Sequence, residues 1–203
     1  MISAQEALVR LQEGNKRFLN GDLNSEILAS PARRNTLITD QNPFAIILGC
    51  SDSRVPAEII FDRGLGDLFV IRVAGNVVAP SQIGSIEYAA EMFNTRLVVV
   101  LGHSNCGAVE ATLQELQQPT DNRSPNLSSI VGRITPSVED LLGGSKPLEM
   151  AELMPQAVEA NILASVQQLQ HGSEILESLV MSGGLQIIGA QYSLETGAVT
   201  FYE

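Results

Sequence analysis

The chain has little of what several classes of protein require. Tryptophan is absent, and cysteine and histidine occur only twice each among 203 residues. Two cysteines are too few for a disulfide framework, so metal binding, redox chemistry or simple burial remain for them. Twelve basic residues stand against 23 acidic ones, a formal net charge of −11. Without a basic cluster, the composition argues against binding to nucleic acid or to an anionic membrane.

Long apolar runs are also missing. No stretch approaches the ~18 consecutive apolar residues of a membrane span. Residues 1–10 have no charged segment followed by an apolar one, which is the pattern of a secretory leader. We therefore expect a cytoplasmic protein. With 44% hydrophobic residues the chain can fill one sizeable core, so we expect a single domain over residues 1–203.

Three short runs rich in Ile and Val dominate the central part of the chain. They occupy residues 44–48, 68–73 and 97–101, and segments with helical spacing at 83–93 and 108–116 follow the second and third. Runs that are apolar at successive positions are typical of strands covered on both faces. The alternation predicts an α/β fold with a central, mostly parallel sheet flanked by helices.

The first residues carry a helix-start signal, because Ser3 and Glu6 form a capping box. We expect an N-terminal helical arm that buries its apolar stripe against its own core or against a partner subunit. Residues 122–144 are polar and contain Gly132 and Pro136, which predicts a broken helix or an excursion over the surface.

The last third of the chain contains two more helical patterns and two strand patterns. Helices are expected at 157–169 and 175–181, with His171 near the end of the first. A strand is expected at 185–190, and a turn then leads into residues 199–202. These segments predict a C-terminal hairpin.

The residues with the most chemistry follow the predicted strands. Cys50 comes two residues after the first run, and His103 and Cys106 come two and five residues after the third. Ligands collect at the carboxyl ends of the strands in such sheets. If the two strands are neighbours, two thiolates and one imidazole converge and suit a catalytic zinc site, with water or Asp52 in the fourth position.

Plainer interpretations of the same residues remain open at this point. Either cysteine could be a buried small hydrophobe. A cysteine nucleophile would have only His103 as its base, so we rank that interpretation below zinc. Asp52 and Arg54 could form a surface ion pair, but beside a metal ligand we expect Arg54 to position Asp52. Its planar guanidinium can hold the carboxylate of Asp52 away from the metal.

The chain resembles a known family at three segments. Residues 50–55 (CSDSRV), 72–76 (RVAGN) and 103–107 (HSNCG) match the three signature segments of the β-class carbonic anhydrases in order and spacing. Residues 189–201 are similar to that family's closing strands. The resemblance covers nearly the whole chain.

The resemblance implies an activity and a ligand set. One zinc ion per subunit would bind Cys50, His103 and Cys106, and Asp52 with Arg54 would form the catalytic pair. The implied reaction is the reversible hydration of carbon dioxide to bicarbonate and a proton by zinc-bound hydroxide. Because two thiolates cancel the charge of zinc, we expect an activity that climbs as the pH rises through neutrality.

The resemblance also implies a substrate pocket and an oligomer. The carbon dioxide pocket would be lined by Gln41, Phe69, Ala74, Tyr88 and Gly107. Some of these residues would come from the other subunit of a homodimer or homotetramer, so that the site lies near the subunit interface.

One departure from the family is informative. Some members carry a Trp shortly before the first Cys, as part of an inhibitory bicarbonate site, and here Ile47 stands in about that place. We therefore expect an open site, in which Asp52 pairs with Arg54 rather than with zinc. Two alternatives remain: a hydrolase of carbon disulfide or carbonyl sulfide on the same scaffold, and a non-catalytic structural zinc protein.

Overall fold

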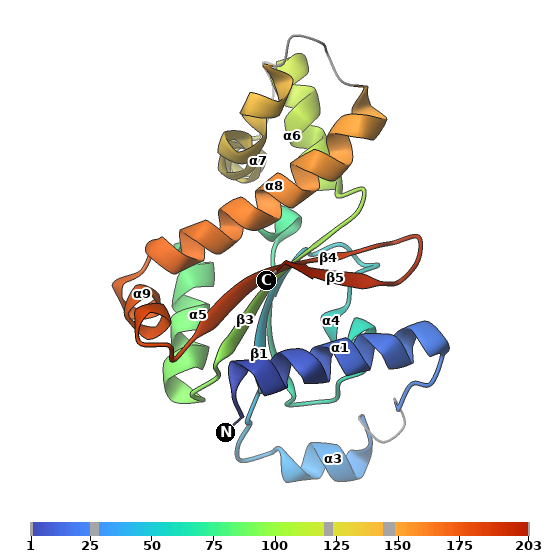
Figure 1. The fold of residues 1–203 in the computed structure, drawn as a ribbon, viewed down its shortest axis with the longest axis vertical. Helices are drawn as coiled ribbons and strands as arrows, with labels where there is room; N and C mark the ends of the chain where they lie inside the picture. Colours follow the sequence, from blue (N-terminus) through green and yellow to red (C-terminus); the bar gives the residue numbers. More distant parts are fainter. Residues whose placement is uncertain (1, 25–28, 120–123, 144–148, 203) are drawn as a thin grey trace.

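The computed structural model describes residues 2–24, 29–119, 124–143 and 149–202. Its centre is a five-stranded sheet in the order β2-β1-β3-β4-β5 (Figure 1). The first four strands are parallel, and β5 runs antiparallel to β4. The strands are β1 (Ala45–Gly49), β2 (Leu68–Arg72), β3 (Leu97–His103), β4 (Gln186–Tyr192) and β5 (Val199–Tyr202).

Helices cover both faces of this sheet. α1 and α4 pack on one face, and α5 to α9 pack on the other. Figure 1 shows α8 crossing the sheet, with α6 and α7 standing beyond its edge. The predicted α/β fold with an N-terminal helix and a C-terminal hairpin is confirmed. The helices are α1 (Ala4–Asn20), α3 (Pro31–Thr36), α4 (Ala57–Ile60), α5 (Pro80–Met92), α6 (Gly107–Gln117), α7 (Pro125–Val138), α8 (Met150–His171) and α9 (Glu174–Met181), with 3₁₀ turns η1 (Ala74–Asn76) and η2 (Glu139–Leu142).

The continuous apolar runs are explained by burial on both faces. Ile46 and Leu48 of β1 point into the core under α5 to α9, whereas Ala45 and Ile47 point into the core under α1 and α4. Successive strand side chains alternate between faces, so only a doubly covered strand is apolar at every position. All residues of β1 and β3 are buried.

The N-terminal helix packs on its own chain. Leu8 and Leu11 of α1 are fully buried against the sheet. Asn15, also buried, donates to the carbonyl of Gly197 at 3.0 Å and accepts from the backbone N–H of Val199 at 3.0 Å. Of the two expectations for this arm, burial in its own core is the one observed.

The segment expected to break is more regular than its sequence suggests. Within the described part of residues 122–144, α7 continues past Gly132 and Pro136 and passes into a 3₁₀ turn only after Val138. Ile134 and Val138 are fully buried against the core. Their packing outweighs the backbone hydrogen bond that Pro136 cannot make.

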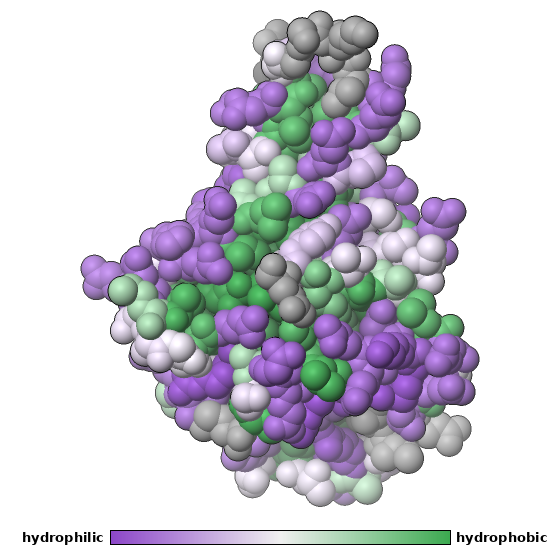
Figure 2. Space-filling model, in the orientation of Figure 1, coloured by the Kyte–Doolittle hydropathy of each residue, from purple (hydrophilic) through white to green (hydrophobic). Residues whose placement is uncertain are grey.

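The surface around the sheet edge is mixed. Figure 2 shows apolar surface in the middle of this face, where β5 lies, between α8 and the more hydrophilic outer side of α1. Among the residues that the structure describes, no helix is both long and apolar enough to cross a membrane.

Candidate metal centre

Two adjacent parallel strands deliver the three predicted ligands to one place. Cys50 directly follows β1, His103 is the last residue of β3, and Cys106 is the N-cap of α6. The ligand atoms of the three side chains all lie within 4.8 Å of one another, and all three residues are buried. The two Sγ atoms are 4.0 Å apart. This spacing lets one small ion contact all three.

The imidazole of His103 is oriented for binding. Its Nδ1 lies 2.9 Å from the carbonyl oxygen of Ser104, which fixes Nδ1 as the protonated nitrogen. Nε2 is buried and has no hydrogen-bond partner within the described residues. A buried nitrogen without a partner is costly unless it binds something. Two thiols and one such imidazole are the donor set that zinc prefers, so the residues fit zinc.

The two thiols influence each other strongly. Hydrogen bonding from Cys106, and more weakly from backbone amides, lowers the pKa of Cys50 to about 4, although burial opposes this. The same hydrogen bond and burial raise the pKa of Cys106. The pair therefore holds one proton between its two sulfurs. A bound cation would take the place of that proton.

Asp52 and Arg54 form a bidentate pair beside this cluster. Arg54 donates from Nε to Oδ1 at 2.9 Å and from Nη2 to Oδ2 at 2.8 Å, and its backbone N–H also donates to Oδ1. These bonds hold the pKa of Asp52 well below its usual range. Oδ2 still lies 3.9 Å from Nε2 of His103. This pairing is the one that an open site requires.

Two further residues hold the loop after β1, and the sequence analysis gave neither a role. Arg72, at the end of β2, donates from Nε to the carbonyl of Cys50 at 3.0 Å and from Nη2 to that of Asp52. Gly75 donates its backbone N–H to Sγ of Cys50 at 3.4 Å. The available signal was that both residues belong to the segment 72–76, which matches the second signature of the family.

The predicted pocket residues divide into two groups. Ala74 and Gly107 lie next to the cluster, since they neighbour Gly75 and Cys106 in the chain. Phe69 lies elsewhere, because it pairs with Ile46 at the start of β1. Cys50 is four residues further along the chain than Ile46, which is about 13 Å at the usual rise of a strand.

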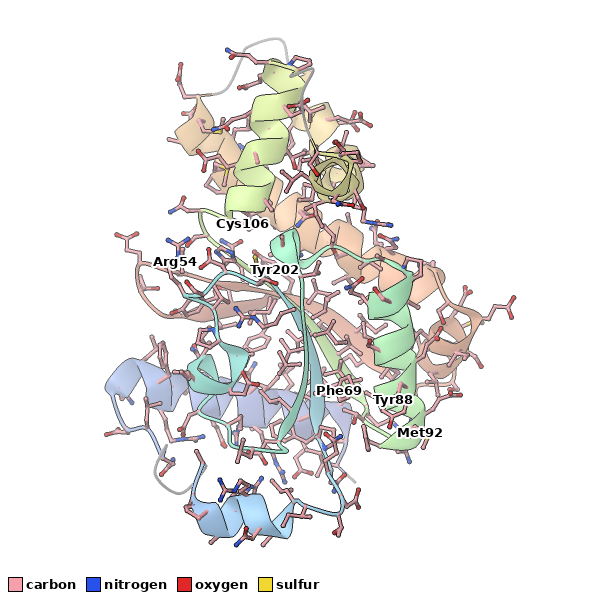
Figure 3. All side chains as sticks on the ribbon, turned by 180° about the vertical axis from the view of Figure 1, so that it is seen from behind. Arg54, Phe69, Tyr88, Met92, Cys106 and Tyr202 are labelled. Carbon is pink, nitrogen blue, oxygen red and sulfur yellow. The ribbon has the colours of Figure 1, made fainter. Side chains whose placement is uncertain are left out.

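Tyr88 and Gln41 lie with Phe69 at the amino ends of the strands. The rings of Tyr88 and Phe69 are 6.3 Å apart between centroids, and Tyr88 and Gln41 both line a cavity of about 570 Å³. Figure 3 shows the separation, with Cys106 and Arg54 near one end of the sheet and Phe69, Tyr88 and Met92 near the other. Within one chain, these three predicted pocket residues do not meet the cluster.

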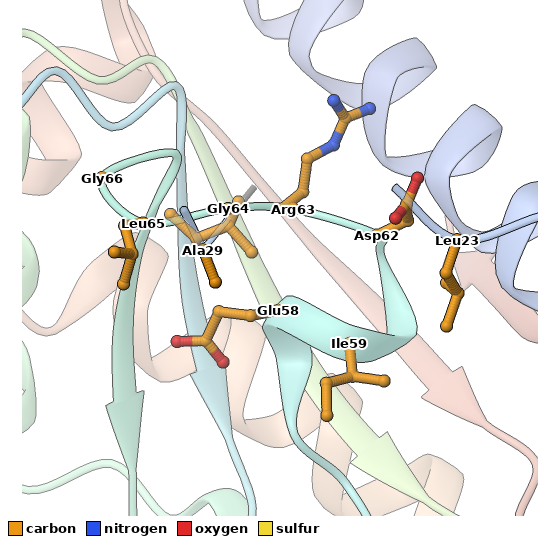
Figure 4. Close-up of a pocket in the computed structure, with 10 residues that line it drawn as sticks. Leu23, Ala29, Glu58, Ile59, Asp62, Arg63, Gly64, Leu65 and Gly66 are labelled. Atoms are coloured by element: carbon orange, nitrogen blue, oxygen red, sulfur yellow. The ribbon is translucent and has the colours of Figure 1, made fainter. Parts of the chain in front are cut away.

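A second cavity contains none of the predicted site residues. It has a volume of about 300 Å³ and lies between α4 and the loop before β2, where Ile59, Leu65 and Asp62 are among its lining residues (Figure 4). Its walls combine apolar and charged side chains with no candidate metal ligand set. We assign it no role in the chemistry.

Comparisons with known proteins agree on one family. The carbonic anhydrase family model matches residues 45–199. Carbonic anhydrase 2 of Mycobacterium tuberculosis is 41% identical over 92% of this chain and 87% of its own length, and the carbonic anhydrase of Mycolicibacterium smegmatis is 40% identical over 93% and 88%. The solved β-carbonic anhydrase CcaA is similar in fold, with a TM-score of 0.75 and 30% identity over 98% of this chain and 88% of that one.

Proposed function

This chain belongs to the β-class carbonic anhydrase family and is a carbonic anhydrase, and from that premise we propose how it performs the hydration of carbon dioxide. One zinc ion is held by Cys50, His103 and Cys106. The observation that carries this proposal is the meeting of the three ligand atoms within 4.8 Å, beside the paired Asp52 and Arg54. We place the protein in the cytoplasm, where reducing conditions keep both thiols free.

The chain's own residues prepare the reacting groups. Zinc, when bound, supplies a Lewis acid that makes water a nucleophile near neutral pH. Asp52 stays ionised because Arg54 depresses its pKa, so its carboxylate can accept a hydrogen bond from the attacking water and orient it. Arg54 keeps that carboxylate fixed beside the ligands. The carbonyl of Ser104 fixes the tautomer of His103.

The substrate pocket is completed by a second copy of the chain. We assign Gln41, Phe69 and Tyr88 to the site of a neighbouring subunit, since within one chain they lie at the opposite edge of the sheet from the ligands. Tyr88 is 51% exposed, so its ring is accessible to a second subunit. Two β-carbonic anhydrases of Sordaria macrospora, similar in fold, are described as tetrameric. We therefore propose a homodimer or homotetramer.

In such an assembly the pocket residues from the neighbouring subunit and those beside the metal ligands have complementary tasks. Phe69 and Tyr88 provide an apolar wall for an uncharged linear substrate. Gln41 can donate its side-chain amide to a substrate oxygen as negative charge develops there. Ala74 and Gly107 are small and exposed, so they leave room for the substrate beside the ligands.

Stopped-flow carbon dioxide hydration on zinc-quantified protein tests the proposal. We expect turnover that climbs between pH 6 and 9 and disappears when a chelator removes the metal. Carbonyl sulfide and carbon disulfide, assayed in parallel, should be poorer substrates. A tightly bound zinc ion without hydration of any of the three would instead indicate a structural site, and a rate already at its plateau at pH 6 would contradict the proposed charge balance.

A further inference from the structure

The turn η1 approaches the candidate metal centre through Gly75. Gly75 has a φ of +67°, and a Cβ built on it would lie 2.8 Å from Cδ1 of Ile134 and 3.1 Å from Cβ of Ala108. Both the backbone conformation and the space therefore require glycine. In this conformation its N–H points at Sγ of Cys50, 3.4 Å away.

A buried amide on α8 fixes that conformation. Asn161 is 3% exposed and donates from Nδ2 to the carbonyl oxygen of Gly75 at 2.9 Å. Ser165, one turn later on α8, donates to the carbonyl oxygen of Asn76 at 3.3 Å. Asn161 and Ser165 interrupt a helix face that is otherwise apolar, since Val158, Ile162 and Leu169 are buried beside them. Burial of an amide is costly unless it is hydrogen-bonded, and the carbonyl of Gly75 is the partner that Asn161 has.

We infer that Asn161 is a positioning residue for the zinc ligand Cys50, acting through Gly75. Fixing the carbonyl of Gly75 holds the residue in its left-handed conformation and keeps its N–H directed at the sulfur. A hydrogen bond to a ligating thiolate withdraws electron density from it, so the metal receives less charge from Cys50. Partners behind the first ligands typically change metal affinity or activity 10- to 100-fold. This inference rests on the zinc site of the proposed function.

Cobalt substitution gives a readout of the sulfur that is independent of turnover. In the Asn161→Leu variant, which has nearly the same volume and no donor, the sulfur-to-cobalt charge-transfer band should move to longer wavelength. The affinity for zinc, measured by chelator competition, should fall about tenfold, because the loss of a fixed position for Cys50 outweighs the stronger donation from its sulfur. Ser165→Ala is the matched control, because it removes a neighbouring buried bond between α8 and η1. It should leave the band in place and the zinc affinity within about twofold of the parent value, since its bond does not reach Gly75.

Two results would overturn the inference. One is an Asn161→Leu variant with the parent's band and zinc affinity, and the other is an equal change in Ser165→Ala, which would make the effect one of packing. A measurement on the parent chain avoids dependence on how the variants fold. With ¹¹³Cd in the site, the amide proton of Gly75 should show scalar coupling to the metal across the hydrogen bond, and its absence would also reject the inference.

The outcomes separate this inference from the proposed function. Cadmium coupling and a cobalt band that responds to Asn161→Leu, in a protein that does not hydrate carbon dioxide, would remove the proposed function and keep the role of Asn161. Normal hydration of carbon dioxide with a cobalt band that does not respond to Asn161→Leu would keep the proposed function and remove the role of Asn161.

Discussion

The two edges of the sheet differ in how complete they are. At the carboxyl edge, the side chains of Cys50, His103 and Cys106 are at most 5% exposed, and hydrogen bonds from β2, η1 and α8 support the surrounding loops. At the amino edge, Tyr88 and Met92 are 51% and 66% exposed and line up on one side of α5. The metal ligands at the first edge are enclosed by their own chain, whereas the apolar side chains at the second edge remain half or more exposed.

The difference separates two requirements of the enzyme. Metal ligands must be preorganised to fractions of an ångström, which a rigid single-chain framework provides. A pocket for a small apolar substrate needs only walls, and these can come from another subunit. We therefore expect changes at the carboxyl edge to affect metal and chemistry, and changes at the amino edge to affect assembly first.

The largest effect is expected from Cys106→Ser. Serine is a poor zinc ligand, so zinc content should fall from one ion per chain to nearly none, and hydration should fall by more than about 100-fold, beyond the usual effect of outer partners. Metal analysis and stopped-flow assays measure both. Size-exclusion chromatography should show unchanged assembly, because the amino edge is intact; full zinc retention would argue against this ligand set.

Asp52→Ala should separate metal binding from chemistry at the same edge. Zinc content should be unchanged, while hydration falls about 10²- to 10⁴-fold through loss of the carboxylate that accepts a hydrogen bond from the attacking water and orients it. Metal analysis beside kinetics checks this. Parallel loss of zinc and activity would instead make Asp52 a ligand, and normal activity with zinc present would remove it from the reaction.

Met92→Glu is expected to disrupt the assembly of subunits at the amino edge of the sheet. A carboxylate buried without a partner at a subunit interface costs several kcal/mol, so the oligomer should dissociate at micromolar concentration. Hydration should then fall at least about tenfold while zinc stays bound. Analytical ultracentrifugation and metal analysis measure the two effects.

Leu127→Glu is the matched control for this change. Leu127 is 62% exposed, nearly as much as Met92, but it lies on α7 away from α5. The variant should assemble and turn over normally. A fully active monomer of Met92→Glu would show that the amino edge does not complete the site.

The smallest effect is expected from Asp62→Asn, which alters an ion pair between Arg17 of α1 and the loop after α4, and which should change neither zinc content nor turnover. Burial alone would raise the pKa of Asp62, but hydrogen bonds from Arg17 and Asn24 outweigh it and the net pKa is lowered. Asn also tolerates the φ of +45° at this position. The variant should lose about 1–2 kcal/mol of unfolding free energy at pH 7.

The pH dependence of that loss follows from the lowered pKa. The carboxylate contributes stability above the unfolded pKa near 4, and the contribution disappears as the pH falls through the lower folded value. The difference between parent and variant should thus narrow below about pH 4. Since the chain has no tryptophan, circular dichroism in urea is the suitable measurement. A difference that stays constant to pH 3 would show that the charge is not its source.

Sequence patterns predicted the sheet and the ligand cluster for the same reason. Doubly covered strands are apolar at every position, and the carboxyl ends of neighbouring parallel strands share an edge, so Cys50 and Cys106 could be brought together without coordinates. The continuation of α7 to Val138 was not predicted, because the burial of Ile134 and Val138 outweighs the tendency of Pro136 to break a helix. The start of α8 at Met150, seven residues before the expected Ala157, was also missed.

The placement of the pocket residues could not be read from local patterns. Which edge carries Phe69 depends on its pairing with Ile46, a contact between strands more than 20 residues apart. The role inferred for Asn161 depends on a contact 86 residues away in the chain. Its only local signal is a polar residue on an apolar helix face.

The bonds of Asn15 to Gly197 and Val199 tie the beginning of the chain to its end, across more than 180 residues. During synthesis, α1 leaves the ribosome long before β4 and β5 exist. Its apolar stripe, with Leu8 and Leu11, can pack on α4 and β3 as soon as the central strands form, but Asn15 lacks its partners until the last hairpin is made. The last hairpin to emerge therefore completes the hydrogen bonds of a helix that its own chain can already hold in place.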